Sequence, residues 1–518
     1  MIRKPGSDDG IPGKSRETFE NPRNFLLGPM FIITVVNNKE KSTNLKSWRE
    51  IPGPSTLPLI GQFHHFLPGG QFAAFPYPLP GGLHLMYERY GPIVKFDGSF
   101  GSPTLIFLYD PEFFLQILRS ENLTPVRVGF QSLDYFRHNY NKERDPNKST
   151  GLLSEHGERW KTFRSTVNPI MLQPKTIKLY KNSLDEVSED MIKRMKLIRN
   201  DKNMLETKFD EEMNLWALES IGVVALGGRI NCLDRNLPEN SPEKKLIHTI
   251  HQIFHIVDEL DFKPSLWRYV TTPGFKKAMK LYENQVELSK FFIGKAIKQL
   301  ENKNKNSNEE KAILEKLLEI DENAALVMAS DMLFAGVDTS ANTMTAILYL
   351  LAKNPEKQEK LREEIMSRNE KQPYLKACIK ESMRMLPVAS GNLRKTTRDY
   401  EVLGYRIPKD MLVTFTHQFL SMQEDQFPRS KEYIPERWIT EKSDPLYYGN
   451  AHPFAFNPFG FGARSCIGRR IAELEIETFL AKIIENFHVE WFGPDLKVKQ
   501  TTLNYIIGPY NFVFKDVK

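Results

Sequence analysis

The fold is decided by one stretch near the C-terminus, Asn457-Pro458-Phe459-Gly460-Phe461-Gly462-Ala463-Arg464-Ser465-Cys466-Ile467-Gly468-Arg469-Arg470. Its glycines tolerate the turns that let a backbone approach a flat ligand closely. Cys466 precedes a predicted helix, whose dipole and free N–H groups stabilise a thiolate. A thiolate held in a rigid, hydrogen-bonding loop is a ligand for haem iron. The alternative is a buried structural cysteine beside a turn.

The run from Phe459 to Gly468 resembles the haem-binding signature of the cytochrome P450 superfamily, Phe-x-x-Gly-x-Arg-x-Cys-x-Gly. The wider resemblance covers residues 50 to 515 and is best to the mitochondrial clan, as found in insects and other animals. It implies a mainly α fold with a small β region, in which a single large domain binds haem (heme b) with Cys466 as the axial iron ligand. It also implies that Phe459, Gly462, Arg464 and Gly468 contact this cofactor.

The composition is that of one large globular unit. The chain has 518 residues, 40% of them hydrophobic, and no Gly/Ser-rich linker divides it, so we expect a single catalytic domain over residues 48–518. Three widely spaced cysteines, Cys232, Cys378 and Cys466, argue against a disulfide framework and a zinc site, which fits a reducing compartment. Acidic and basic residues are interspersed and the net charge is only +6, so nucleic-acid binding has no support.

The first 47 residues differ from the rest, and we expect a presequence or a poorly ordered segment there. They mix acidic with basic residues, which makes them a weak match to a mitochondrial transit peptide. The apolar run from Phe25 to Val36 is too short to cross a bilayer, which takes about 20 residues. With no signal anchor visible, we expect a mitochondrial protein with peripheral contact to the matrix side of the inner membrane; a microsomal protein is the less favoured alternative.

A long apolar helix is predicted from Ala324 to Leu351. It would measure roughly 40 Å, and a helix that is hydrophobic nearly all round either spans a membrane or is buried in a large domain. Asp331, Asp338 and Asn342 disfavour the membrane. We therefore expect this helix to pass through the middle of the domain.

This helix contains the sequence Ala335-Gly336-Val337-Asp338-Thr339. From the residues alone, the favoured interpretation is a Thr339 hydroxyl bonded to a carbonyl one turn earlier, with Asp338 at a polar edge. The family resemblance implies instead an oxygen-activation motif, in which Gly336 lets the helix open beside the iron. Thr339 would then hydrogen-bond the dioxygen substrate and Asp338 would help to relay protons, both as catalytic residues. The reduction of dioxygen needs two protons as well as two electrons, which gives an acid–alcohol pair a chemical reason.

A second predicted helix, from Tyr374 to Leu386, carries Glu381 and Arg384 at i, i+3 on one face. The ordinary interpretation is a surface ion pair worth under about 1 kcal/mol. The resemblance implies a buried network that Glu381 and Arg384 close with Arg437, in the sequence Pro435-Glu436-Arg437-Trp438. We assign these residues to assembly of the haem pocket and not to its chemistry.

Trp160 and Arg164 lie one turn apart on a predicted amphipathic helix, so their side chains point the same way. The resemblance implies that both meet the haem propionates, together with Arg394 and Arg464. Taken singly, each arginine is more often a solvated surface charge.

Basic residues supply the prediction of an electron donor. In the mitochondrial clan, side chains like Lys376, Lys380 and Arg470 receive an acidic ferredoxin, which is itself reduced by an NADPH-dependent ferredoxin reductase. The alternative is an ordinary solvated basic face. The segment between Pro355 and Lys376 is shorter than is usual in that clan, and it lies beside the expected docking face.

The family alignment also suggests which segments line the substrate pocket: residues 125–147, 215–224, 254–262, 388–392 and 501–504. Several are rich in Phe, Leu and Val, as a site for an apolar molecule requires. The resemblance therefore implies a lipophilic small-molecule substrate, a xenobiotic or a steroid-like molecule, which is hydroxylated with O2. The alternatives are a haem-thiolate isomerase or dehydratase, and a non-catalytic haem-binding protein.

Overall fold

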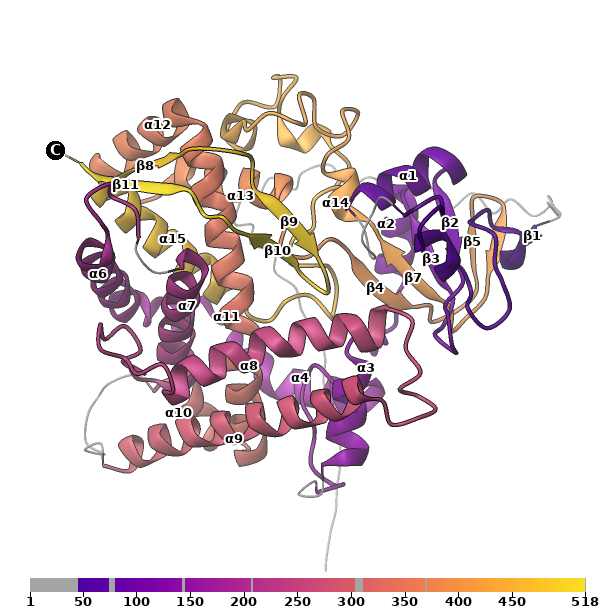
Figure 1. Ribbon diagram of the computed structural model, residues 1–518, viewed down its shortest axis with the longest axis horizontal. Coiled ribbons are helices and arrows are strands. Elements are labelled where there is room, and N and C mark those ends of the chain that lie inside the picture. The colour runs from indigo at the N-terminus through magenta and orange to yellow at the C-terminus, as the bar shows by residue number, and fades with distance from the viewer. Residues whose placement is uncertain are drawn as a thin grey trace, which may run out of the picture. The chain divides into compact units, whose positions relative to one another are not determined.

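The computed structural model describes residues 45–517 apart from 74–79, 142–144, 206–207, 303–310 and 369. Residues 1–44 of the expected presequence therefore lie outside the described residues. The helices are α1 (Pro80–Tyr90), α2 (Pro111–Arg119), α3 (Gln131–Tyr135), α4 (Gly157–Met171), α5 (Pro174–Lys178), α6 (Lys181–Ile198), α7 (Phe209–Leu226), α8 (Pro242–Val257), α9 (Pro273–Glu301), α10 (Ile313–Leu318), α11 (Glu322–Lys353), α12 (Pro355–Met366), α13 (Pro373–Met385), α14 (His417–Leu420) and α15 (Arg469–Asn486) (Figure 1). Two π-helical turns, η3 (Phe136–Tyr140) and η4 (Asp258–Phe262), extend α3 and α8.

The predicted central helix is α11. Its first turn is capped by Asp321, whose side chain accepts a hydrogen bond from the N–H of Ala324 at 2.9 Å. Among the described residues it is the helix whose length and hydropathy would allow a membrane crossing, but it packs against α7, α8, α9, α10 and α13, and most of its side chains are buried. The expectation of a helix buried through the domain is confirmed (Figure 1).

The strands form four small sheets. They are β1 (Lys46–Ser47), β2 (Ile93–Phe96), β3 (Leu105–Leu108), β4 (Asn392–Lys395), β5 (Tyr400–Val402), β6 (Tyr405–Ile407), β7 (Leu412–Phe415), β8 (Phe487–Trp491), β9 (Lys497–Gln500), β10 (Asn504–Ile507) and β11 (Phe512–Asp516). The largest sheet has the order β2-β3-β7-β4, with β3 and β7 parallel and the outer pairs antiparallel. The other sheets are β1-β6-β5, β9-β10 and β8-β11. Two residues that we assigned to the presequence, Lys46 and Ser47, thus lie in a sheet.

Two hydrophobic cores hold these layers together. The larger one lies among the helices around α11, and the smaller one joins the four-stranded sheet to α2 through residues such as Ile106, Phe114 and Phe415. The mainly α fold with a small β region is the one that we expected. Residues 121–131, which follow α2, and residues 387–394, which lead from α13 into β4, carry several of the residues described next.

Candidate active site

The cysteine loop has the geometry that its glycines predict. Gly460 and Gly462 adopt φ values of +71° and +74°, which side chains rarely tolerate. The N–H of Cys466 donates to the carbonyl of Phe459 at 2.9 Å, and this bond closes the loop. Gly468 is the N-cap of α15, so Cys466 does lie just before a helix N-terminus. Its side chain is accessible, whereas the other two cysteines are buried.

The loop alone does not favour the thiolate, contrary to our expectation. Packing against protein atoms raises the pKa of the Cys466 thiol, and this effect is larger than the lowering by the Gly468 N–H and by the guanidinium groups of Arg164 and Arg127. Desolvation by the surrounding protein atoms disfavours the charged thiolate and is the largest of these contributions. A metal ion bound at the sulfur would reverse the balance, because a coordinated thiol is deprotonated.

Four arginines surround this loop. Three of them, Arg164, Arg394 and Arg464, are those expected from the sequence, and the fourth, Arg127, was missed. Arg464 donates to the carbonyls of Pro125, Leu152 and Glu155 at 2.9–3.1 Å, and its guanidinium lies 3.9 Å from the ring centroid of Trp160. Trp160 and Arg464 therefore form one buried stack.

The remaining arginines have fewer partners. Arg164 donates from Nη2 to the Ser465 carbonyl at 3.1 Å, but its buried Nε has no partner among the described residues. Arg394 pairs with Glu121 at 2.9 Å and donates to the Phe461 carbonyl at 3.1 Å. Arg127 has no hydrogen-bond partner in the part of the chain that the structure describes. The arginines expected to bind the haem propionates therefore lie close together, but they differ in the number of N–H groups that have no partner among the described residues.

The cluster holds an excess of positive charge. Four guanidinium groups face one carboxylate, that of Glu121, and burial together with mutual repulsion lowers the pKa of Arg127 to about 10 and that of Arg464 to about 9. Buried charges without partners are costly, so such a cluster is complete only with an anionic ligand. A haem, which carries two propionates and accepts a thiolate on its iron, fits this donor set.

The Thr339 hydroxyl and the Asp338 carboxylate of α11 have different surroundings. The Thr339 hydroxyl donates to the Ala335 carbonyl at 2.7 Å, which is the helical bond expected from the residues alone, and both residues keep accessible surface inside the domain. Asp338 is fully buried. Its Oδ2 accepts from the Tyr505 hydroxyl at 2.5 Å and lies 3.3 Å from Nδ1 of His251, whereas its Oδ1 has no partner among the described residues.

Gly336 has a packing role that we did not expect. A Cβ at this position would lie 2.6 Å from Cγ1 of Ile221 on α7, so the glycine is required by the close approach of α7 and α11. The same contact explains why residues 215–224 do not line the apolar cavity described below: α7 packs against α11 there instead.

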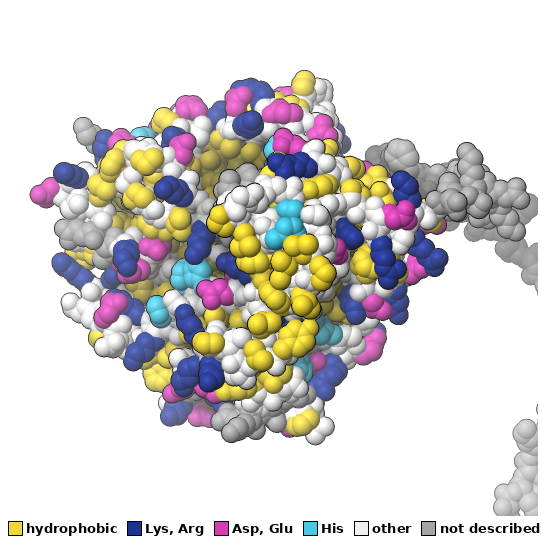
Figure 2. Space-filling view, turned by 45° about the vertical axis from the view of Figure 1, so that its right-hand side comes forward, with side chains coloured by type: hydrophobic (Ala, Val, Ile, Leu, Met, Phe, Trp, Pro, Cys, Tyr) yellow, Lys and Arg dark blue, Asp and Glu magenta, His cyan; other side chains and the backbone are white. Residues whose placement is uncertain are grey.

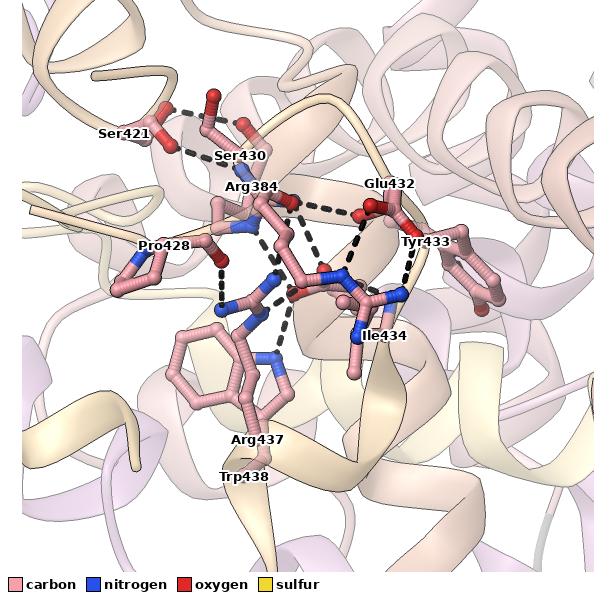
Figure 3. A network of polar contacts seen from close by, with 12 residues as sticks. Arg384, Ser421, Pro428, Ser430, Glu432, Tyr433, Ile434, Arg437 and Trp438 are labelled. Atoms are coloured by element: carbon pink, nitrogen blue, oxygen red, sulfur yellow. Dashed lines mark hydrogen bonds and ion pairs between the residues drawn. The ribbon is translucent and has the colours of Figure 1, made fainter. Parts of the chain in front are cut away.

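Glu381 is the centre of a saturated network. Its two oxygens accept from Arg384 at 2.8 and 3.0 Å, from Nε of Arg437 at 3.1 Å, from the Trp438 indole at 2.9 Å and from the Ile434 N–H at 3.0 Å. All three charged side chains are completely buried. Figure 3 shows how the two arginines also reach backbone carbonyls of the loop before Tyr433, among them that of Pro428. The ordinary surface ion pair is excluded by this burial.

An apolar cavity of about 360 Å³ lies between the sheet and the helices. Its walls come from ten separate stretches of chain, which include residues 127–130, 389–393 and 500–503. Five phenylalanines contribute to its apolar wall: Phe66, Phe96, Phe107, Phe130 and Phe262. Four of the five segments expected to form the pocket have residues in this wall, and Arg127 links the cavity to the arginine cluster.

The three basic residues expected to receive a partner lie on α13 and α15. Lys376 is 4.0 Å from Glu477, and both Lys376 and Lys380 lower the pKa of that acid against the larger, raising effect of its burial. Arg470 donates to the Leu172 carbonyl at 2.6 Å and stays exposed. Positions 470 and 477 are two turns apart on α15, so the three cations share one side of this helix.

Comparison with known proteins agrees with this geometry. A family model described as Cytochrome P450 matches residues 51–514. Cytochrome P450 CYP12A2 of Musca domestica is 40% identical over 500 residues, which cover 91% of this chain and 92% of that protein. Cytochrome P450 12b1, mitochondrial, of Drosophila acanthoptera is 34% identical over 483 residues, which cover 90% of this chain and 88% of that protein.

Proposed function

This chain belongs to the cytochrome P450 family of haem-thiolate monooxygenases, and we propose that Cys466 provides its thiolate and that the arginine cluster holds its haem. The predictions of the family, of the haem cofactor, of the monooxygenase class and of a mitochondrial protein are confirmed by these relatives. The observation that supports the site assignment is the excess of buried guanidinium groups beside an accessible loop cysteine.

When bound, the haem supplies the redox chemistry that places one atom of dioxygen in a substrate C–H bond and reduces the other to water. The residues of this chain position it. Arg127 and Arg164 have N–H groups left for the propionates, while Arg394 and Arg464 are held by carbonyls and fix the cluster. Phe459, Gly462 and Gly468 shape the loop, and Gly468 leaves the space beside the sulfur free, since a Cβ there would lie 3.9 Å from Sγ.

Thr339 and Asp338 are proposed to hold and move protons. The Thr339 residue keeps accessible surface, and its hydroxyl would hydrogen-bond the oxygen substrate after leaving the Ala335 carbonyl. One oxygen of Asp338 has no partner in the part of the chain that the structure describes, and the other is bonded to Tyr505, with His251 close by. Each transfer along these groups moves one proton and no electrons, and a buried acid is suited to it because bulk water is kept away.

The substrate is proposed to be a lipophilic small molecule, a xenobiotic or a steroid-like compound. The support is the phenylalanine-lined cavity, in which a polar substrate would lose its hydration without gaining partners. Polar groups of the lining that could orient such a molecule include Arg127, Asn392 and Gln500, together with several serine and threonine hydroxyls.

The electrons are proposed to come from a ferredoxin that is itself reduced by an NADPH-dependent reductase. Lys376, Lys380 and Arg470 give one side of α15 a positive surface, which would attract an acidic partner mainly by raising the association rate. The six residues 367–372 that join α12 to α13 are too few to cover α13 with a further helix.

Contact with the inner membrane is proposed for a second surface. Leu59, Tyr269 and Val270 are 83%, 67% and 56% exposed, and they are neighbours, because Phe100 donates to the Leu59 carbonyl while a Cβ on Gly101 would meet the Tyr269 hydroxyl. Figure 2 brings this side forward and shows hydrophobic side chains gathered on it. Such a patch on an otherwise charged surface is typical of a membrane contact.

Turnover with purified components tests these assignments together. With ferredoxin, ferredoxin reductase and NADPH, oxygen consumption should depend on a lipophilic substrate, which an isomerase, a dehydratase or a haem carrier would not show. Thr339→Ala should lower product formed per NADPH by about 100-fold. The matched variant Thr345→Ala, which removes the same kind of hydroxyl-to-carbonyl bond at 2.8 Å on α11, should not. Unchanged coupling in Thr339→Ala contradicts its role, and faster turnover with a microsomal flavin reductase contradicts the ferredoxin.

A further inference from the structure

Two cavities meet at one segment of chain. The apolar cavity is lined by residues 127–130, whereas a larger outer cavity of about 870 Å³ is lined by Val126, Val128, Gln131 and, opposite them, residues 267–271. The segment 126–131 is therefore the partition between them. Because successive side chains of an extended segment point to opposite sides, Val126 faces the outer cavity and Arg127 the inner one.

The partition ends at the start of α3, and this helix has no cap of its own. Its N-cap residue is Phe130, whose side chain accepts no hydrogen bond, so the first N–H groups of α3 need an outside acceptor. Asp261 of η4 supplies it. Its oxygens accept from the N–H of Ser132 at 3.0 and 3.1 Å and from the Ser132 hydroxyl at 2.7 Å.

This contact is buried and is extended by other elements. The Ser132 hydroxyl also shares a hydrogen bond of 2.8 Å with Tyr282 of α9, and Arg268 donates to the side chain of Gln131 at 2.8 Å. In Figure 1, α3 lies beside the ends of α8 and α9, and it contacts α9 and η4, the π-helical turn that extends α8. The residues next to the contact, Phe130 and Phe262, both line the apolar cavity.

We propose that Asp261 is a positioning residue that holds the partition closed by capping α3, and that it thereby decides which lipophilic molecules pass from the outer to the inner cavity. Losing this acceptor would release the N–H groups of α3 together with Phe130. The role in selectivity rests on the proposed function, whereas the capping contact does not.

The ionisation of Asp261 gives the contact a pH dependence whose sign can be stated. Burial raises its pKa to about 7, although the hydrogen bonds from Ser132, the charge of Arg268 and the Gln131 N–H lower it. The other facing groups are Tyr282 and, beyond it, Arg137. An opened, hydrated Asp261 would have a pKa near the ordinary 3.8, so the closed form binds the proton more tightly. Rising pH between about 4 and 7 should therefore loosen the partition.

Hydrogen exchange of the substrate-free haem protein tests the contact directly. Asp261→Ala should speed exchange of the α3 amides by about tenfold or more, because several hydrogen bonds are lost. Asp261→Asn keeps an acceptor and cannot ionise, so it should retain slow exchange at pH 8. The control is Asp258→Ala, on the same η4 but paired with Lys263 at 2.6 Å, which should leave α3 unchanged.

Spectral titration with a small and a large lipophile tests the selectivity. Asp261→Ala should change the ratio of the two dissociation constants by several fold, and Asp261→Asn should restore it. Unchanged exchange in α3 overturns the cap, and faster exchange with an unchanged ratio overturns the selectivity. If the wild-type protein binds no lipophile at all, the proposed function fails while the exchange result still decides the cap. Should Asp261→Ala not accumulate, Ser132→Ala removes the hydroxyl bonds to Asp261 and Tyr282, and Tyr282→Phe removes the bond between Ser132 and Tyr282 alone. Both variants should give smaller changes of the same kind, and Tyr282→Phe should give the smaller one.

Discussion

The protein contains two clusters of arginines that differ in how many of their donors have partners. Around Glu381, two guanidinium groups, an indole and a backbone N–H share one carboxylate, and the remaining donors reach carbonyls. Beside Cys466, four guanidinium groups share one acid among the described residues, Glu121, and the buried Nε of Arg164 has no partner among those residues. The first cluster is complete within the chain, and the second is complete only with an anion.

The number of hydrogen-bond partners therefore indicates, without reference to sequence motifs, that the Glu381 cluster is structural and that the cluster beside Cys466 binds a ligand. A saturated buried network contributes specificity to the fold, and removing one member leaves an uncompensated charge. An unsaturated one stores repulsion that a ligand relieves, so its arginines are free to bind. Substitutions in the two clusters should therefore differ in kind as well as in size.

The largest effect is expected at the sulfur that the unsaturated cluster surrounds. Cys466→Ala should abolish the strongly red-shifted Soret band of the reduced, carbon-monoxide-treated protein and all substrate-dependent turnover. Cys378→Ala, a change of the same size at a buried cysteine of α13, should keep both. A red-shifted band in Cys466→Ala would exclude this cysteine as the ligand.

Breaking the saturated cluster should destabilise the whole domain. Glu381→Ala leaves two buried guanidinium groups without their acid, and we expect a loss of about 3–5 kcal/mol in the free energy of unfolding. Thermal or denaturant unfolding measures it. The comparison variant is Glu158→Ala, which breaks an exposed pair with Lys161 at 3.1 Å and should cost under about 1 kcal/mol. Equal losses in the two variants would refute the distinction.

A substitution in the unsaturated cluster should weaken haem binding without lowering the stability of the haem-free protein. Arg127→Gln removes one of four repelling charges, so the folded protein should not lose stability before haem binds, yet the cofactor should be held less tightly. A charge-assisted hydrogen bond is worth about 1.5–3 kcal/mol, so hemin should leave more than about tenfold faster. Transfer of hemin to an excess of an acceptor protein measures this rate. A slower or unchanged release contradicts the binding role of Arg127.

Glu475 is a buried acid without an arginine partner among the described residues, and it can be compared with Glu381. Burial between α11 and α15 raises the pKa of Glu475 to about 8, with one weak hydrogen bond from Ser340 at 3.4 Å. The unfolded chain releases this proton near pH 4.5, so between pH 4.5 and 8 stability should fall as pH rises, by up to about 1.4 kcal/mol per unit. Glu475→Gln should flatten this slope in unfolding curves, whereas Glu473→Gln, at a residue paired with Arg469, should not.

The smallest effect is expected on the surface. Lys376→Glu and Lys380→Glu should each slow association with ferredoxin by less than about tenfold, and the effect should shrink at high salt because exposed charges are screened. Stopped-flow reduction at two ionic strengths measures it. Lys280→Glu, at an exposed residue of α9 distant in sequence from α13 and α15, serves as the control. Equal slowing by all three variants would place the partner elsewhere.

The sequence predicted the elements whose signals are local. The buried helix α11 and the helix that begins after Cys466 follow from apolar periodicity and from glycines within a few residues. Glu381, Arg384 and Arg437 could be named because two of them are three residues apart and the third lies in a short motif. The family resemblance, and not any spacing, supplied their burial.

The residues that were missed are joined only by the tertiary fold. Arg127 lies 337 positions before Arg464, Tyr505 lies 167 positions after Asp338, and Asp261 meets a helix that starts 130 positions earlier. None of these pairs leaves a pattern in the chain. The charge excess around Cys466 could be counted only once the segments were folded together.

Because Gly336 has no side chain, α7 packs closely against α11 one turn from Thr339. Since α7 approaches α11 so closely that Ile221 occupies the volume that a Cβ on Gly336 would need, the packing of α7 fixes the position of α11 at this turn and, with it, that of Thr339. The two positions should therefore covary: a relative with alanine in place of Gly336 is expected to carry a smaller residue in place of Ile221.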